Sequence, residues 1–410
     1  MNIHQTIRTT DRKNTSSGLL LITLALLSAF GPFVTDLYLP ALPSLTKYFQ
    51  TSTSNVQLSL SLSMLGLALG QLLIGPLSDK YGRKSPLLVC MWIFLISTIA
   101  CLFSWDIYSF VFFRLIQGMA GAGGVVLSKS IPTDMFTGKD LAKYIAIISA
   151  INGIAPIVSP VIGGILLEFT DWKSAFWVLL GLGALILFLS YRLKESLPND
   201  KRSNKSTLST FKTLGKVFKN PTYTFNTFTL VMSAVVLFSY IASSPFIIQE
   251  HYGFSALMFS LFFGLNSLSI VIGSALSMRF EQPKNSIIVG SVGMLIFSIT
   301  TGFCLFFNLP FLYFETSLIF VLFFFGLLLP SSTALALDSE RENAGSASAA
   351  IGSITFLGGS ICTPLVGIGN LLHSTAICII IGGILTALFC YLARRNEKRI
   401  MNINMFEVNS

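Results

Sequence analysis

The chain alternates long apolar segments with short polar ones. A helix rises 1.5 Å per residue, so an apolar run of about 18 residues or more is long enough to cross a bilayer. Such runs predict twelve membrane-spanning helices, over residues 18–42, 55–76, 86–104, 107–128, 144–167, 174–192, 223–245, 256–278, 286–307, 312–331, 345–368 and 374–393.

One polar segment, residues 193–222, is much longer than the other connections and is basic, which is typical of a linker between two halves. Pro40 and Pro245 lie near the corresponding ends of the first and seventh spans, which favours two related halves. We therefore expect an all-α membrane protein with two pseudo-symmetric six-helix bundles. Its parts are an N-terminal tail (1–17), a first bundle (18–192), the linker (193–222), a second bundle (223–393) and a C-terminal tail (394–410).

The composition agrees with an integral membrane protein. Hydrophobic residues make up 53% of the 410 residues and charged residues only 11%, with a mean hydropathy of +0.74. A soluble protein of this length needs more polar surface than that. The six cysteines fall inside predicted spans without the spacing of metal ligands, so no metal site is expected.

The distribution of basic residues predicts the orientation. The net charge is +9, but of 27 Lys and Arg only Lys47 and Lys173 fall in the odd-numbered connections. Arg114 and Lys129 lie within or at the end of a span, and the rest lie in the tails and the even-numbered connections. By the positive-inside rule both termini face the cytoplasm, and the basic linker is expected to contact anionic lipid and not nucleic acid.

A charged turn joins the second and third predicted spans. It reads Gly75-Pro-Leu-Ser-Asp79-Lys-Tyr-Gly82-Arg83-Lys84, and it resembles the loop signature of the major facilitator superfamily, Gly-x-Leu-x-Asp-Arg/Lys-x-Gly-Arg-Arg/Lys. The resemblance implies a transporter that alternates access to a central site, with a gating loop made of Gly75, Asp79, Gly82, Arg83 and Lys84. Asp79 and Arg83, four residues apart, can pair. A loop whose only role is to set the membrane topology would explain the basic residues but not the two glycines, Gly75 and Gly82.

Two ionisable residues lie inside predicted spans, where a charge is costly and is a functional candidate. Asp36 lies near the outer end of the first span and Arg114 lies at a similar depth in the fourth. Arg114 needs a partner or a water-filled cavity; Asp36 is one candidate partner, and Gln117 falls on the same helical face. Alternatively, Asp36 reaches interfacial water and Arg114 extends outward to it.

Both segments extend the resemblance. Asp36-x-x-x-Pro40-x-x-Pro43 is similar to a motif of twelve-span drug:proton antiporters of the Bcr/CflA (bicyclomycin and chloramphenicol resistance) type, and Arg114-x-x-Gln117-Gly118 is similar to an element linked to proton transfer. The resemblance implies a proton-coupling site at Asp36, Arg114 and Gln117.

Two further segments are similar to the same group. The fifth span carries a small-residue motif in which Ala155 and Ser159 replace glycines, and there the resemblance implies helix bending at Pro156, Pro160, Gly163 and Gly164. In the seventh span, the resemblance implies a cavity in the second bundle, lined by Tyr240, Ser243, Ser244 and Pro245.

The expected function is secondary active transport. The three histidines fall in tails or loops, and neither a nucleophile motif nor a nucleotide-binding loop occurs, which argues against a membrane-embedded enzyme or receptor and against ATP as energy source. The resemblance implies proton-driven efflux of small lipophilic compounds across the bacterial inner membrane by a monomer without cofactor. Export or facilitated passage of an endogenous metabolite is the alternative. If Asp36 does not carry the proton, Glu168, Glu250 and Glu315 are the other candidate acids.

Overall fold

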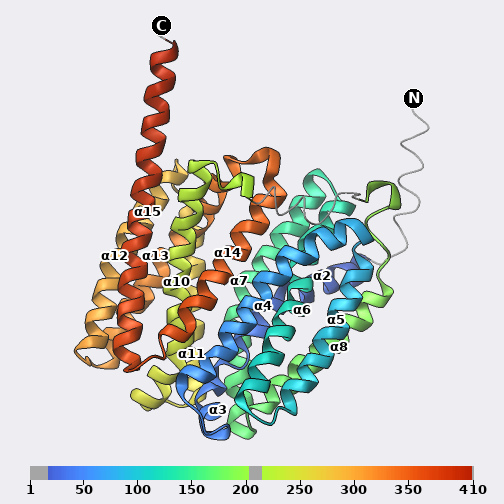
Figure 1. Cartoon of the computed structure of the whole chain (residues 1–410), viewed down its shortest axis with the longest axis vertical. Helices are drawn as coiled ribbons and strands as arrows, with labels where there is room; N and C mark the ends of the chain where they lie inside the picture. Colours follow the sequence, from blue (N-terminus) through green and yellow to red (C-terminus); the bar gives the residue numbers. More distant parts are fainter. Residues whose placement is uncertain (1–16, 203–214, 409–410) are drawn as a thin grey trace.

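The computed structural model describes residues 17–202 and 215–408, which form two helical bundles lying side by side (Figure 1). The first bundle contains α2 (Ser17–Asp36), η2 (Leu39–Ala41), α3 (Leu42–Tyr48), α4 (Thr53–Tyr81), α5 (Lys84–Leu102), α6 (Ile107–Met135), α7 (Gly138–Phe169) and α8 (Lys173–Arg192). The second contains α10 (Pro221–Phe246), η4 (Ile247–His251), α11 (Ala256–Ser277), α12 (Pro283–Phe306), α13 (Phe311–Asp338), α14 (Ala344–Leu365) and α15 (Leu371–Val408).

Twelve helices in the described residues are long and apolar enough to cross a membrane, which confirms the predicted number of spans. α15 continues to Val408, through most of the segment assigned to the C-terminal tail. Residues 1–16 of the expected N-terminal tail and residues 203–214 of the expected linker lie outside the described part of the chain.

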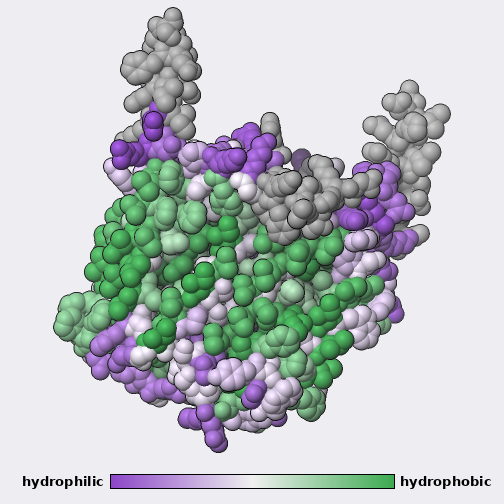
Figure 2. Space-filling model, viewed as in Figure 1, coloured by the Kyte–Doolittle hydropathy of each residue, from purple (hydrophilic) through white to green (hydrophobic). Residues whose placement is uncertain are grey.

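Apolar side chains form a broad band around the molecule, and hydrophilic ones gather at its two ends (Figure 2). We call the end where α2 begins and α15 ends the terminal end; it carries the α4–α5 turn and residues 193–202. The other end, the distal end, carries the α5–α6 turn and η4.

Several helices begin at side-chain caps. At the distal end, Asp106 caps α6 by accepting from the Ser109 N–H, and this bond holds the pKa of Asp106 below its ordinary value.

The first span is not one continuous helix. α2 ends at Asp36, and the chain then passes through η2 and α3 to Tyr48. Pro40 and Pro43 explain the break, because proline lacks an N–H donor and disfavours helical geometry at the residue before it. The interruption leaves Asp36 at the C-terminal end of a helix, inside a span that the sequence predicted as uninterrupted.

The two bundles contact each other toward the distal end. Gln249 Nε2 donates to the Pro40 carbonyl at 3.0 Å, and Gln57 Nε2 donates to the Ala242 carbonyl at 3.1 Å. At the terminal end the bundles are separated by a cavity of about 660 Å³ between α4, α6 and α14. The structure is thus closed at one end and hollowed at the other.

Candidate functional site

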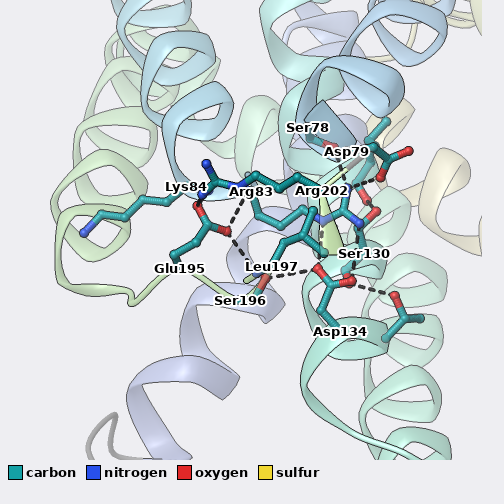
Figure 3. A network of polar contacts seen from close by, with 12 residues as sticks. Ser78, Asp79, Arg83, Lys84, Ser130, Asp134, Glu195, Ser196, Leu197 and Arg202 are labelled. Atoms are coloured by element: carbon teal, nitrogen blue, oxygen red, sulfur yellow. Dashed lines mark hydrogen bonds and ion pairs between the residues drawn. The ribbon is translucent and has the colours of Figure 1, made fainter. Parts of the chain in front are cut away.

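Arg83 is the centre of a polar network at the terminal end (Figure 3). Its Nη1 donates to Asp79 Oδ1 at 2.5 Å, and its Nε donates to Asp134 Oδ2 at 2.7 Å. Burial opposes the charge of Arg83, but the hydrogen bonds and negative charges of Asp134 and Asp79 outweigh it and raise the pKa of Arg83. The network therefore ties the α4–α5 turn to the end of α6.

Glu195, from the segment after α8, joins this network. Its Oε1 accepts from the backbone N–H of Arg83 at 2.7 Å and its Oε2 from that of Lys84 at 3.2 Å. A carboxylate at this place satisfies amides that lack partners at the start of α5 and complements the positive end of the helix. Sequence reasoning missed both Glu195 and Asp134. The signals were an acid in a basic linker and an acid just beyond a span.

Gly82 is required by this arrangement. Its φ is +89°, and a Cβ placed on it would lie 2.4 Å from Glu195 Oε2. Lys84 Nζ donates a hydrogen bond to the Tyr191 carbonyl at 2.8 Å. Gly75 lines the terminal cavity. The five residues of the predicted gating loop thus occupy one structural unit.

The terminal cavity lies between the gating loop and the second bundle. Asp79 and Arg83 line one wall, and Gly345 and Ser346, at the N-terminal end of α14, line another. Deeper in the cavity lie Gln71 and Gly352. Asp79 and the start of α14 therefore line the same cavity. Among the described residues, no hydrogen bond or ion pair joins them.

Arg114 is fully buried and is held by neutral groups. Its Nη1 donates to Gln117 Oε1, and its Nη2 donates to the Val34 carbonyl at 2.9 Å. Its guanidinium lies 4.3 Å from the centroid of the Tyr38 ring. Gln117 in turn donates to Thr98 Oγ1 at 2.7 Å. The Val34 carbonyl belongs to the last turn of α2, where carbonyls lack regular partners, so Arg114 caps α2.

The proposed pairing of Arg114 with Asp36 is not found. The ion pairs of the described residues include neither side chain. Asp36 is 7% exposed at the end of α2, two residues beyond the carbonyl that Arg114 binds. The Val34 carbonyl is available to Arg114 because α2 ends at Asp36, so that the residue four positions further on, Tyr38, lies beyond the helix. Outward extension of Arg114 is excluded as well, since its exposed fraction is 0%.

The small-residue motif of α7 packs against both bundles. A Cβ on Gly163 would lie 2.0 Å from the Leu37 carbonyl, and one on Gly164 would lie 2.3 Å from Ser260 Oγ of α11. Ser159, where the resemblance expects glycine, places its hydroxyl 3.5 Å from the Pro32 carbonyl. Pro156 and Pro160 lie within α7, which remains one helix. Close approach is therefore visible here, while bending stays a prediction.

In the second bundle, Tyr240 lies in a buried cluster with two residues that were not assigned to a site. Asn266 Nδ2 donates to the Tyr240 hydroxyl at 3.1 Å and to Glu315 Oε1 at 2.9 Å. Ser243 bonds back to the Ser239 carbonyl of its own helix. Ser244 and Pro245 are buried in α10. These serines give no sign of lining an open cavity.

The gating-loop network, the interrupted first span and the two bundles occur together with a family match. Residues 24–363 match the model of the Major Facilitator Superfamily. The chain belongs to that superfamily. It is therefore a secondary transporter, as the resemblance of the loop implied, and it has the twelve spans that the apolar runs predicted.

Relatives agree with this assignment. The chain is 36% identical over 353 residues to the MFS-type transporter YdgK of Bacillus subtilis, covering 85% of this chain and 88% of YdgK. It is 27% identical over 396 residues to a bicyclomycin resistance protein homolog of Haemophilus influenzae, covering 93% and 98%. It is 25% identical over 352 residues to the multidrug resistance protein D of Escherichia coli, covering 84% and 88%.

Solved structures show the same fold. A bacterial homolog of the human lysosomal transporter Spinster, in an inward-facing and unoccupied conformation, matches with a TM-score of 0.73 at 17% identity, over 93% of this chain and 98% of that one. The xylose transporter XylE of E. coli, in a partially occluded inward-open conformation, matches with a TM-score of 0.72 at 15% identity, over 91% and 96%.

Proposed function

We propose that this protein is a proton-coupled exporter of small, lipophilic compounds of the Bcr/CflA type, working in a bacterial plasma membrane with both termini in the cytoplasm. Relatives named for bicyclomycin resistance and multidrug resistance support the drug-export part, as do the motifs around Asp36 and Arg114. The basic residues at the terminal end support the orientation.

One observation carries the coupling mechanism. Asp36 is buried at the end of a helix, where the helix dipole is negative, and no cation lies within ion-pair distance among the described residues. Binding a proton therefore removes an uncompensated charge from this place. Arg114 fixes the end of α2 through the Val34 carbonyl, so a change at Asp36 acts directly on the backbone that Arg114 holds.

Alternating access then works as follows. With the proposed orientation, the distal end, where Gln249 contacts Pro40, is the outer side and is closed, and the hollowed terminal end is the cytoplasmic side. In the opposite state the terminal cavity closes, and Asp79 approaches the positive N-terminal end of α14. The gating loop thus exchanges contacts within one bundle for contacts between bundles.

The polar lining of the cavity favours a second candidate. Gln71, Ser130 and Lys129 line it together with the charged gating loop, and such groups suit a polar endogenous metabolite as well as a drug. Export of such a metabolite uses the same coupling machinery.

A compound screen separates the two candidates. A pump-deleted bacterial host expressing the wild type is compared with one expressing Asp36→Asn, at matched protein levels. Drug export predicts resistance to lipophilic antibiotics that D36N loses. Metabolite export predicts no resistance, but a compound enriched in the medium of wild-type cells and not of D36N cells.

A further inference from the structure

The second bundle holds a buried polar cluster whose acid the coupling mechanism above does not use. It consists of Tyr240 on α10, Asn266 on α11 and Glu315 on α13, which are 3%, 0% and 5% exposed. Asn266 connects the other two by donating to both. Of the acids considered as alternatives to Asp36, Glu168 and Glu250 are exposed, and only Glu315 is buried.

Two oxygens of this cluster have no hydrogen-bond partner among the described residues, namely Glu315 Oε2 and Asn266 Oδ1. An ionised carboxylate and an amide oxygen are both acceptors only, so neither can satisfy the other. The ion pairs of the described residues do not include Glu315 either. A buried carboxylate oxygen without a partner lacks a hydrogen-bond donor.

A proton on Oε2 supplies that donor. It turns Oε2 from an acceptor into an O–H group, and Oε1 continues to accept from Asn266 Nδ2. Protonation also removes a buried charge that no cation offsets. The unpartnered oxygen of Glu315 thus points to a proton as its ligand, and a proton needs no space beyond the cluster itself.

We propose that Glu315 is a second proton-carrying residue, so that each transport cycle moves two protons, one bound at Asp36 in the first bundle and one at Glu315 in the second. This role in transport rests on the proposed proton-coupled export. An O–H bond forms at Glu315 with a proton taken from water on the outer side, and the same bond breaks when the proton is released to the cytoplasm.

The groups around the cluster agree with a site for a single proton. Tyr240 is the titratable neighbour from α10, and its hydroxyl accepts from Asn266. α11 contributes the uncharged Asn266. α12 brings the thiol of Cys304, which contacts Ser317 of α13.

Infrared difference spectroscopy tests the proton site without any transport substrate. The purified full chain is taken through a pH step, and the C=O stretch of protonated buried carboxyls is recorded. The wild type should show two such contributions, Glu315→Gln should lose one, Asp36→Asn the other, and the double variant both. Asn266→Leu should shift the Glu315 band without removing it, because it changes the hydrogen bonding of the acid. Glu250→Gln, which changes an exposed acid, is the matched control and should retain both bands.

A spectrum of E315Q that is identical to that of the wild type overturns the proposal. Gln can keep the contact with Asn266, so E315Q is expected to fold. Should it elute as aggregate, Glu315→Asp provides the second test, since it must shift the band and an unshifted band overturns the proposal equally.

Transport of ethidium, a permanent monovalent cation, tests the stoichiometry in inverted membrane vesicles. Exchange of two protons for one such cation moves net charge, so a membrane potential alone should drive accumulation by the wild type. E315Q exchanges one for one and should respond to a pH gradient but not to the potential. An equal response of both proteins to the potential overturns the two-proton cycle. If the wild type moves no ethidium under any gradient, the export function fails for this probe, and the infrared bands still decide whether Glu315 binds a proton.

Discussion

The carboxylate of Glu195 accepts a hydrogen bond from the backbone N–H of Arg83 at 2.7 Å, across 112 positions of sequence. This contact places the segment that follows α8 against the turn between α4 and α5 (Figure 3). The segment is the first part of the linker between the bundles, which begins at residue 193. The linker is therefore attached to the gating loop and does more than tether the two halves.

Glu195→Ala should loosen the gating loop. The substitution leaves the amides of Arg83 and Lys84 without their acceptor, and a helix N-terminal cap contributes about 1 kcal/mol. We expect a lower unfolding temperature in detergent and faster modification of a cysteine placed at Lys80. Glu250→Ala, which removes an exposed acid at the distal end, is the control. Equal unfolding temperatures and labelling rates in the two variants would mean that the Glu195 contact is incidental.

Asp134→Asn and Asp79→Asn should differ in their effects. The side chain of Asp134 is 13% exposed and that of Asp79 is 52% exposed, although both pair with Arg83. Leaving Arg83 without its buried partner should cost about 3 kcal/mol of stability, against about 1 kcal/mol or less for the exposed one. We expect D79N instead to slow turnover while substrate binding is retained, because the loop acts on conformational exchange. Unchanged transport rates in D79N vesicles would count against the gate.

Asp36→Asn should abolish uphill export while substrate binding persists. Asparagine keeps the shape of the side chain and removes the group that takes up a proton. The measurement is accumulation of a substrate found in the compound screen, in proteoliposomes with a pH gradient, alongside binding of that substrate in detergent. Export against the gradient with an unchanged pH dependence would make Asp36 structural.

Arg114→Lys should impair the protein even though the charge is kept. Lysine lacks the planar fork that reaches Gln117 and the Val34 carbonyl together. Losing one hydrogen bond to a charged group costs about 1.5–3 kcal/mol, or roughly a tenfold or larger loss of transport rate if the bond is needed for turnover. Wild-type rates in R114K would show that the positive charge alone suffices.

Cysteine labelling should report the orientation. In a variant without the six native cysteines, Asp200→Cys lies at the terminal end and Trp105→Cys at the distal end, and both positions are exposed. An impermeant maleimide added to intact cells should modify the Trp105→Cys variant and not the Asp200→Cys variant, because the basic residues predict that the terminal end lies in the cytoplasm. The reverse pattern would invert the topology and, with it, the direction of proposed transport.

The sequence by itself determined the number of spans, their order and the gating loop. Hydropathy is a property of consecutive residues, and a span needs only length and apolar composition to be recognised. The pairing of Asp79 with Arg83 is equally local, since only four positions separate the two residues across the turn at Gly82.

Only the tertiary structure decided which side chains meet. Arg114 binds the Val34 carbonyl and not Asp36. A backbone oxygen carries no sequence signal, and this one becomes available because α2 ends at Asp36. Glu195 and Asp134 join Arg83 from distant positions, and Asn266 brings Glu315 to Tyr240 from a third helix. These contacts depend on how the helices are rotated and packed against one another, and hydropathy along one chain does not contain that information.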